Sequence, residues 1–249
     1  MLNTDSRVTA SRFTANIAVM AAMVAILDSI PMIPGFYSGV WDSWLFLISP
    51  LIGVLLGPYG GALSVAIGTL TGHLVYFRDP YELVFMLGAP TGAAVSGLVY
   101  EKRWGPVLIL YSGLLLAYLA TPVSWVLPLW GVWDILAGYL VVLVFAVSVR
   151  LNWRRVVSPI MTKVGLVFST VIGLESDILT RVFIFIPCDT YRLFYGLNTE
   201  QLQILWLGAG VTTPLKVAIA VIVAVTIGTA LSRQLRTQPS RPEDQLNNH

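Results

Sequence analysis

"VGLVFSTVIGLESDILTRVFIFI", residues 164–186, is an apolar stretch long enough to cross a bilayer, yet it contains Glu175, Asp177 and Arg181. A transmembrane helix needs about 20 predominantly apolar residues. An ionisable side chain at bilayer depth costs about 3 kcal/mol and almost always faces the interior of a helical bundle or a water-filled cavity. The stretch therefore predicts a membrane-embedded helix that carries a polar site inside a bundle.

The composition of the whole chain supports this interpretation. Of 249 residues, 56% are hydrophobic and only 11% are charged, with a mean hydropathy of +0.78. Soluble domains carry about 25% charged residues, so lipid must contact much of the surface. The net charge of +2 is too small to indicate a nucleic-acid partner. A single cysteine and two histidines predict neither a disulfide framework nor a metal centre, and we expect no cofactor.

Apolar segments predict an all-α, polytopic transmembrane bundle of about eight spans. The bundle occupies 13–233, between a cytoplasmic segment 1–12 and a polar tail, 234–249, that we expect to be disordered. The second span is short and contains Pro50, and the division between the fifth and sixth stays open around Pro122 and Pro128. The expected spans are 13–30, 43–57, 59–77, 82–100, 104–121, 127–149, 159–186 and 207–232.

The basic residues indicate the orientation of these spans. With the N-terminus inside, only Arg78 and Arg192 fall in outer loops. Cytoplasmic loops of membrane proteins are enriched in Lys and Arg, so we expect an even number of spans, both termini in the cytoplasm and a location in the cell membrane. The cytoplasmic segments would contain Arg7, Arg12, Lys102, Arg103, Arg150, Arg154, Arg155, Arg233, Arg236 and Arg241.

Several ionisable residues fall in the outer half of this bundle. Glu175 and Asp177 lie well along their helix, and Lys216 lies about a third of the way down the last one. We expect Glu175 and Lys216 to contact polar groups of a ligand in one outward-facing pocket, which His73 also borders. Arg181 follows Asp177 by one helical turn and can pair with it, whereas Glu175 points about 200° away. Structural ion pairs and snorkelling are the alternative for His73, Asp177 and Arg181.

Aromatic residues gather in the outer loops. Tyr37 and Trp41 precede the second span, and Tyr195 precedes the last one. We expect these three side chains to stack on the ring of a ligand. The alternative is an aromatic belt at the headgroup level, although such belts populate both interfaces.

Small residues form stripes along the first and third spans. Ala18 and Ala22 are four residues apart, and "LLGPYGGALSVAIGTLTG", residues 55–72, is rich in glycine. Small side chains let helices approach closely in lipid. Internal packing explains the glycine stripe, whereas the alanine face can dock a separate protein.

These features together resemble the substrate-binding (S) components of energy-coupling factor (ECF) vitamin transporters. The resemblance is carried by Ala18 and Ala22, by the Gly-Pro junction in residues 55–72, and by "TTPLKVAIAVIVAVTIG", residues 212–228. It covers roughly two-thirds of the chain. That family has six spans, so 104–121 and 127–149 would be an inserted hairpin and 159–186 would take the place of the fifth span.

The resemblance implies a subunit that captures a vitamin-like, ring-bearing small molecule from outside the cell. It would deliver this molecule through a transmembrane coupling (T) subunit driven by two cytoplasmic ATPase subunits. The resemblance places the coupling contact at Ala18, Ala22 and Ala25, and the loops that close over the ligand at 31–42 and 187–206.

Two other functions stay open. A self-sufficient, ion-coupled secondary transporter would use Glu175 and Asp177 as a relay, although no internal repeat is evident. An intramembrane enzyme would need Glu175, Asp177 and His73, but no nucleophile motif or paired metal ligands accompany them. No phosphate-binding loop with the GxxxxGK[ST] pattern occurs, so ATP would have to act through a partner.

Overall fold

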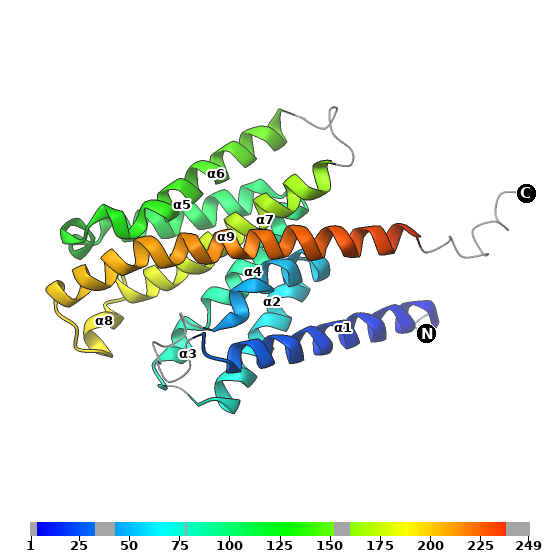
Figure 1. Ribbon diagram of the computed structural model, residues 1–249, viewed down its shortest axis with the longest axis horizontal. Helices are drawn as coiled ribbons and strands as arrows, with labels where there is room; N and C mark the ends of the chain where they lie inside the picture. Colours follow the sequence, from blue (N-terminus) through cyan, green and yellow to red (C-terminus); the bar gives the residue numbers. More distant parts are fainter. Residues whose placement is uncertain (1–3, 33–42, 78, 152–159, 238–249) are drawn as a thin grey trace, which may run out of the picture.

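The computed structural model describes residues 4–32, 43–77, 79–151 and 160–237, and its regular elements in these ranges are helices (Figure 1). An isolated backbone bridge joins Pro31 to Ser43. The α-helices are α1 (Thr4–Ser29), α2 (Ser49–Val75), α3 (Glu82–Phe85), α4 (Gly88–Tyr100), α5 (Trp104–Ala120), α6 (Trp133–Arg150), α7 (Ile160–Phe185), α8 (Thr190–Leu193) and α9 (Thr199–Thr237). Short 3₁₀ segments are η2 (Trp44–Leu47), η3 (Pro122–Val126) and η4 (Leu129–Val132).

In the described ranges the prediction of an all-α bundle is confirmed, and its long apolar helices are consistent with a membrane-embedded protein. Within the described ranges, five helical stretches are long and apolar enough to cross a bilayer. They are Ser11–Ser29, Ser49–Val75, Glu82–Tyr100, Leu129–Arg150 and Thr199–Ala230. Helix α5 is apolar but shorter, and α7 is long but carries the ionisable residues that the sequence singled out. The number of complete crossings and the side of the termini stay predictions. The first turn of α1 and the last turn of α9 lie at the same end of the bundle (Figure 1).

Helix α2 is broken at the Gly-Pro junction. Gly57 has φ 76° and ψ 174°, and Pro58 follows it. A positive φ is readily adopted only by glycine. The segments on either side fold back so sharply that a Cβ on Gly61 would lie 2.5 Å from the Cα of Gly53, whereas eight residues of straight helix span about 12 Å. The expected boundary between residues 57 and 59 is thus correct, but the first segment is helical only from Ser49 and is too short to span a bilayer alone.

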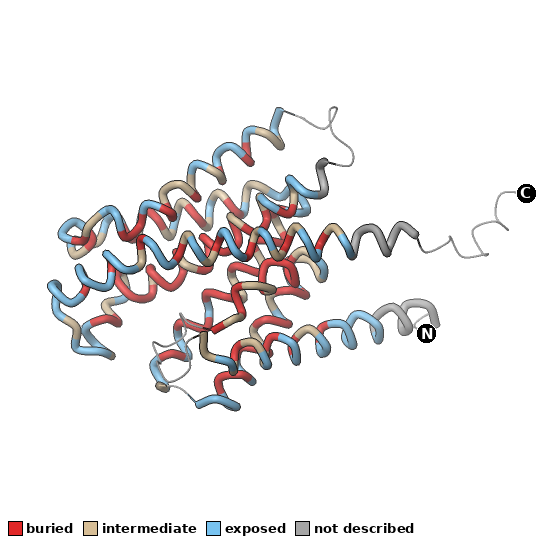
Figure 2. Tube along the Cα trace, in the orientation of Figure 1, coloured by how far each residue is buried: buried red, intermediate tan, exposed pale blue. Residues whose placement is uncertain are grey.

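Helix α7 lies at the centre of the bundle and is surrounded by α4, α5, α6 and α9 (Figures 1 and 2). It approaches α4 closely, because a Cβ on Gly92 would lie 2.7 Å from the carbonyl oxygen of Gly173. Residues 171–185 of α7 are all buried or half-buried, so the protein itself encloses Glu175, Asp177 and Arg181. Helix α1 instead packs on α2 at one edge of the bundle, with Ala21 and Val24 against Gly68.

Helix α9 is much longer than the expected span 207–232. It begins at a reciprocal cap in which the backbone N–H of Gln201 donates to Asn198 Oδ1, and the N–H of Asn198 donates to Gln201 Oε1, each at 2.9 Å. This is the pattern of a capping box. At its other end α9 continues to Thr237, four residues into the tail expected to be disordered, and residues 238–249 lie outside the described ranges.

Candidate functional site: a polar cavity between α7 and α9

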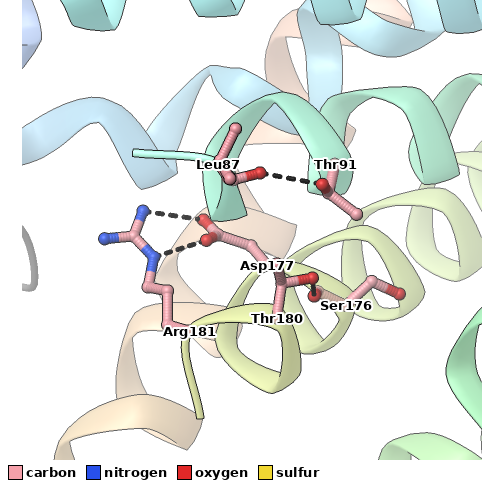
Figure 3. A network of polar contacts seen from close by, with 6 residues as sticks. All are labelled: Leu87, Thr91, Ser176, Asp177, Thr180 and Arg181. Carbon is pink, nitrogen blue, oxygen red and sulfur yellow. Dashed lines mark hydrogen bonds and ion pairs between the residues drawn. The ribbon is translucent and has the colours of Figure 1, made fainter. Parts of the chain in front are cut away.

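Asp177 and Arg181 form the ion pair that their spacing predicts. Arg181 Nε donates to Asp177 Oδ1 at 2.5 Å and Arg181 Nη2 donates to Oδ2 at 3.3 Å (Figure 3). Both residues are 6% exposed. Gly88 of α4 makes room for the pair, because a Cβ there would lie 2.8 Å from Arg181 Nε. The absence of a side chain at one position of α4 thus lets a buried ion pair sit between two closely packed helices.

This pair borders a cavity of about 50 Å³ between α7, α9 and η2, which we call the polar cavity. Lys216 and Thr213 of α9 line its opposite side. Three of the residues predicted to bind substrate, Asp177, Arg181 and Lys216, therefore meet at one place although they come from different helices. The remaining lining residues are Ser43, Leu45, Phe46, Leu174, Ile178 and Val217.

Glu175 does not line the polar cavity. Its side chain points toward α5 and α6, where its Cγ would lie 2.8 Å from a Cβ placed on Gly138 and where the hydroxyl of Tyr111 also reaches. The 200° separation from Asp177 predicted this divergence, but the expectation that Glu175 and Lys216 share a pocket is wrong. On α7, the apolar residues Leu174 and Ile178 line the polar cavity instead.

His73 lies at the interface between α1 and α2, not at the cavity. It is 1% exposed, and its ring lies 6.0 Å from that of Phe77. The adjacent Gly72 lies against Asp28, whose Oδ2 would be 2.8 Å from a Cβ on that glycine. His73 and Asp28 therefore belong to the packing of the first two helices, which agrees with the structural alternative left open by the sequence.

Tyr195 also lies away from the polar cavity. Its ring packs against Phe85 at 6.3 Å and Phe185 at 6.2 Å between ring centroids. Burial, followed by the neighbouring Glu82 and Asp79 carboxylates, raises the pKa of Tyr195 to about 12. The segment expected to be a closing loop at 187–206 thus packs as an aromatic cluster that includes two helical pieces. Tyr37 and Trp41, the other two expected stacking residues, lie outside the described residues.

One side of the alanine-rich part of α1 packs on α2, and the other side is exposed. Ala18 and Ala22 are exposed and Ala25 is half-buried, whereas Ala21 on the other side contacts α2. The face proposed to dock a partner is therefore an outer surface of this chain. Val19 and Met23 extend it with larger apolar side chains.

Thr213 is the contributor to the cavity that sequence reasoning missed. Its hydroxyl contacts Asp134 Oδ2 at the first turn of α6 and lies 2.9 Å from the carbonyl oxygen of Ala209. A threonine in an apolar helix gives no distinctive signal, and its role depends on the distant Asp134.

Comparisons of the chain with family models, curated proteins and solved structures found no match.

Proposed function

We propose that this protein is the membrane-embedded capture subunit of an ECF-type transporter, and that it binds its small-molecule substrate at the polar cavity. The observation that carries the proposal is the convergence of Asp177, Arg181, Lys216 and Thr213 on one cavity inside an apolar bundle. Ionisable residues at this depth are costly and mark sites for ligands or ions. Ligand pockets combine such a small number of polar groups with an apolar wall.

The lining residues indicate which part of a substrate the cavity accepts. Arg181 and Lys216 are cationic, and Asp177 is the anionic residue among the lining side chains. The cavity of about 50 Å³ has room for a compact polar group rather than for a whole vitamin. We therefore propose that it holds an anionic end, such as a carboxylate, of a ring-bearing substrate, and that Asp177 fixes the orientation of Arg181.

The partner assignment rests on α1 and on the sequence resemblance. Helix α1 exposes Ala18 and Ala22 along a surface that packs on none of the described helices. Small residues allow close approach of a second membrane protein in lipid. We propose that the transmembrane coupling subunit docks there, and that its two ATPase subunits supply the energy at the cytoplasmic face of the cell membrane.

Native mass spectrometry of the purified protein tests the substrate site. We expect a co-purified small molecule with wild-type protein and with Lys163→Gln, because Lys163 is an exposed cation at the start of α7. The same molecule should be lost from Lys216→Gln. Equal retention by both variants would remove the polar cavity as the binding site.

A second pair of variants tests the coupling surface separately. Ala18→Trp should keep the bound small molecule but prevent co-purification with the coupling subunit. Ile109→Trp places the same side chain at a 76% exposed position of α5 and should leave the association intact. If the isolated chain takes up the small molecule into liposomes along an ion gradient, the protein is a secondary transporter and the proposal of a capture subunit is wrong.

A further inference from the structure

A second polar group lies on the face of α7 that points away from the polar cavity. Glu175 meets Tyr111 of α5 at Gly138 of α6, where a Cβ would lie 2.6 Å from the Tyr111 hydroxyl and 2.8 Å from Glu175 Cγ. Asp134 lies on the same face of α6, one helical turn before Gly138. Electrostatic interactions link the Asp134 and Glu175 carboxyls to each other and to Tyr111. We call Asp134 and Glu175 the carboxylate pair.

The hydrogen bonds of the carboxylate pair are incomplete. Glu175 is 3% exposed and Asp134 is 4% exposed. Asp134 accepts hydrogen bonds from Thr213 and from the backbone N–H of Ile135, whereas the buried Glu175 Oε2 has no partner among the described residues. The Tyr111 hydroxyl donates to the carbonyl oxygen of Ile135 at 2.7 Å, so its own oxygen remains able to accept or coordinate.

Among the described residues, no positive side chain compensates these two acids. In the described part of the chain, neither Asp134 nor Glu175 forms an ion pair with a lysine, arginine or histidine. The other ionisable groups on the helices around α7 lie elsewhere. Lys216 of α9 lines the polar cavity, Arg181 is bound to Asp177, and Tyr139 of α6 shares a hydrogen bond with Ser112. His73 of α2 packs against α1, and Tyr100 of α4 is exposed.

Two neighbouring buried carboxylates cannot both carry an uncompensated charge, since their mutual repulsion adds to the cost of removing each from water. We propose that the carboxylate pair binds one monovalent cation, either a proton or a sodium ion, with the Tyr111 hydroxyl oxygen as a third oxygen at the site. The unpartnered Glu175 Oε2 is the atom that the cation satisfies. Oxygen ligands suit both sources, because a carboxyl group takes up a proton on one of its own oxygens and hard cations prefer oxygen donors.

The proposed cation site does not depend on the proposed transport function. However, Thr213 connects the carboxylate pair to the polar cavity. This residue lines the polar cavity and contacts Asp134 through its hydroxyl. Occupancy of the carboxylate pair therefore affects a group that faces the cavity. A movement of α9 at the cavity would in turn alter the hydrogen bonding of Asp134.

Two measurements on the full-length protein in lipid nanodiscs test the proposal. Infrared spectroscopy at neutral pH detects the carbonyl band of a protonated carboxyl group. Thermal unfolding in sodium chloride, compared with choline chloride at equal ionic strength, detects stabilisation by sodium. We expect one of these signals in the wild-type protein: the band if a proton occupies the site, or sodium-dependent stabilisation if sodium does.

Variants assign the signal to the carboxylate pair. Glu175→Gln and Asp134→Asn keep the size of the side chains and should abolish the wild-type signal, whereas Glu200→Gln, at an exposed acid in the first turn of α9, should preserve it. A wild-type protein with neither signal overturns the proposal without any variant. A signal that persists in folded Glu175→Gln protein, with unchanged helical circular dichroism, overturns it as well.

Discussion

The Asp177–Arg181 pair allows a quantitative prediction, because its geometry and burial are both defined. The side chains of Arg181 and Asp177 are 8% and 9% exposed, so water screens their interaction only weakly. Charges about 4 Å apart at an effective dielectric constant of about 20 attract by about 4 kcal/mol. Removing one member of a buried pair leaves the other uncompensated and costs about 3–5 kcal/mol. We therefore expect Asp177→Asn to destabilise the protein by this amount.

A double-mutant cycle measures this coupling. Asp177→Asn alone should lower the midpoint of thermal unfolding in nanodiscs by roughly 6–20 °C, since each kcal/mol shifts a protein of this size by about 2–4 °C. Adding Arg181→Gln removes the unpaired cation, so the double variant should recover most of the loss. Asn keeps the volume of Asp, and Gln is smaller than Arg, so both substituted side chains fit the space beside Gly88 of α4.

Two outcomes of the cycle would contradict this prediction. If Asp177→Asn is within about 0.5 kcal/mol of wild type, or if the two substitutions are additive within that limit, the pair contributes nothing specific to the fold. The cavity wall would then tolerate an unpaired arginine. Arg181, rather than the pair, would in that case be the group to test against a substrate.

Two further predictions concern the α4–α7 interface and the aromatic cluster around Tyr195. Gly92→Ala should destabilise the protein by about 1–3 kcal/mol in thermal unfolding, because its Cβ meets the rigid backbone oxygen of Gly173, whereas Gly113→Ala in α5 meets nothing within 4 Å and should be neutral or stabilising. Glu82→Gln should lower the pKa of Tyr195 from about 12 in a spectrophotometric tyrosinate titration, and an unchanged pKa would leave burial and Asp79 as its causes. Since the pKa of Tyr195 is raised above its ordinary value of 10.0, its contribution to stability should be complete below pH 10 and lost as the pH rises toward 12.

The predictable parts of this structure are those fixed by local spacing. Gly57 and Pro58 break α2 where the sequence indicates, because a positive φ and a missing N–H act on the backbone directly. Asp177 and Arg181 pair because residues four apart share a helix face. The start of α9 was predictable too, since Asn198 and Gln201 have the spacing of a capping box. Apolar periodicity alone does not detect this start, because the first turn of α9 is polar.

The parts that could not be predicted depend on which neighbours surround α7. Helical periodicity gives the angle between Glu175 and Asp177 but not the direction in which either points. That direction is set by glycines on other helices, with Gly138 of α6 admitting Glu175 and Gly88 of α4 admitting the Asp177–Arg181 pair. A glycine opposite a charged residue many positions away leaves no mark in a single sequence.

The two acids of α7 thus face two different surroundings, which are connected by α7 itself and by one hydroxyl group. Asp177 faces the polar cavity and Glu175 faces Asp134, while Thr213 of α9 contacts both surroundings. The same stretch of α9 is anchored to α6 where Trp133 Nε1 donates to the carbonyl oxygen of Gly210 at 2.7 Å. Because this anchor holds α9 close to Asp134, a substrate that displaces α9 must either break the Thr213–Asp134 contact or carry α6 with it. Either response changes the oxygens around Glu175, so substrate binding at the cavity and cation binding at the carboxylate pair are expected to influence each other reciprocally.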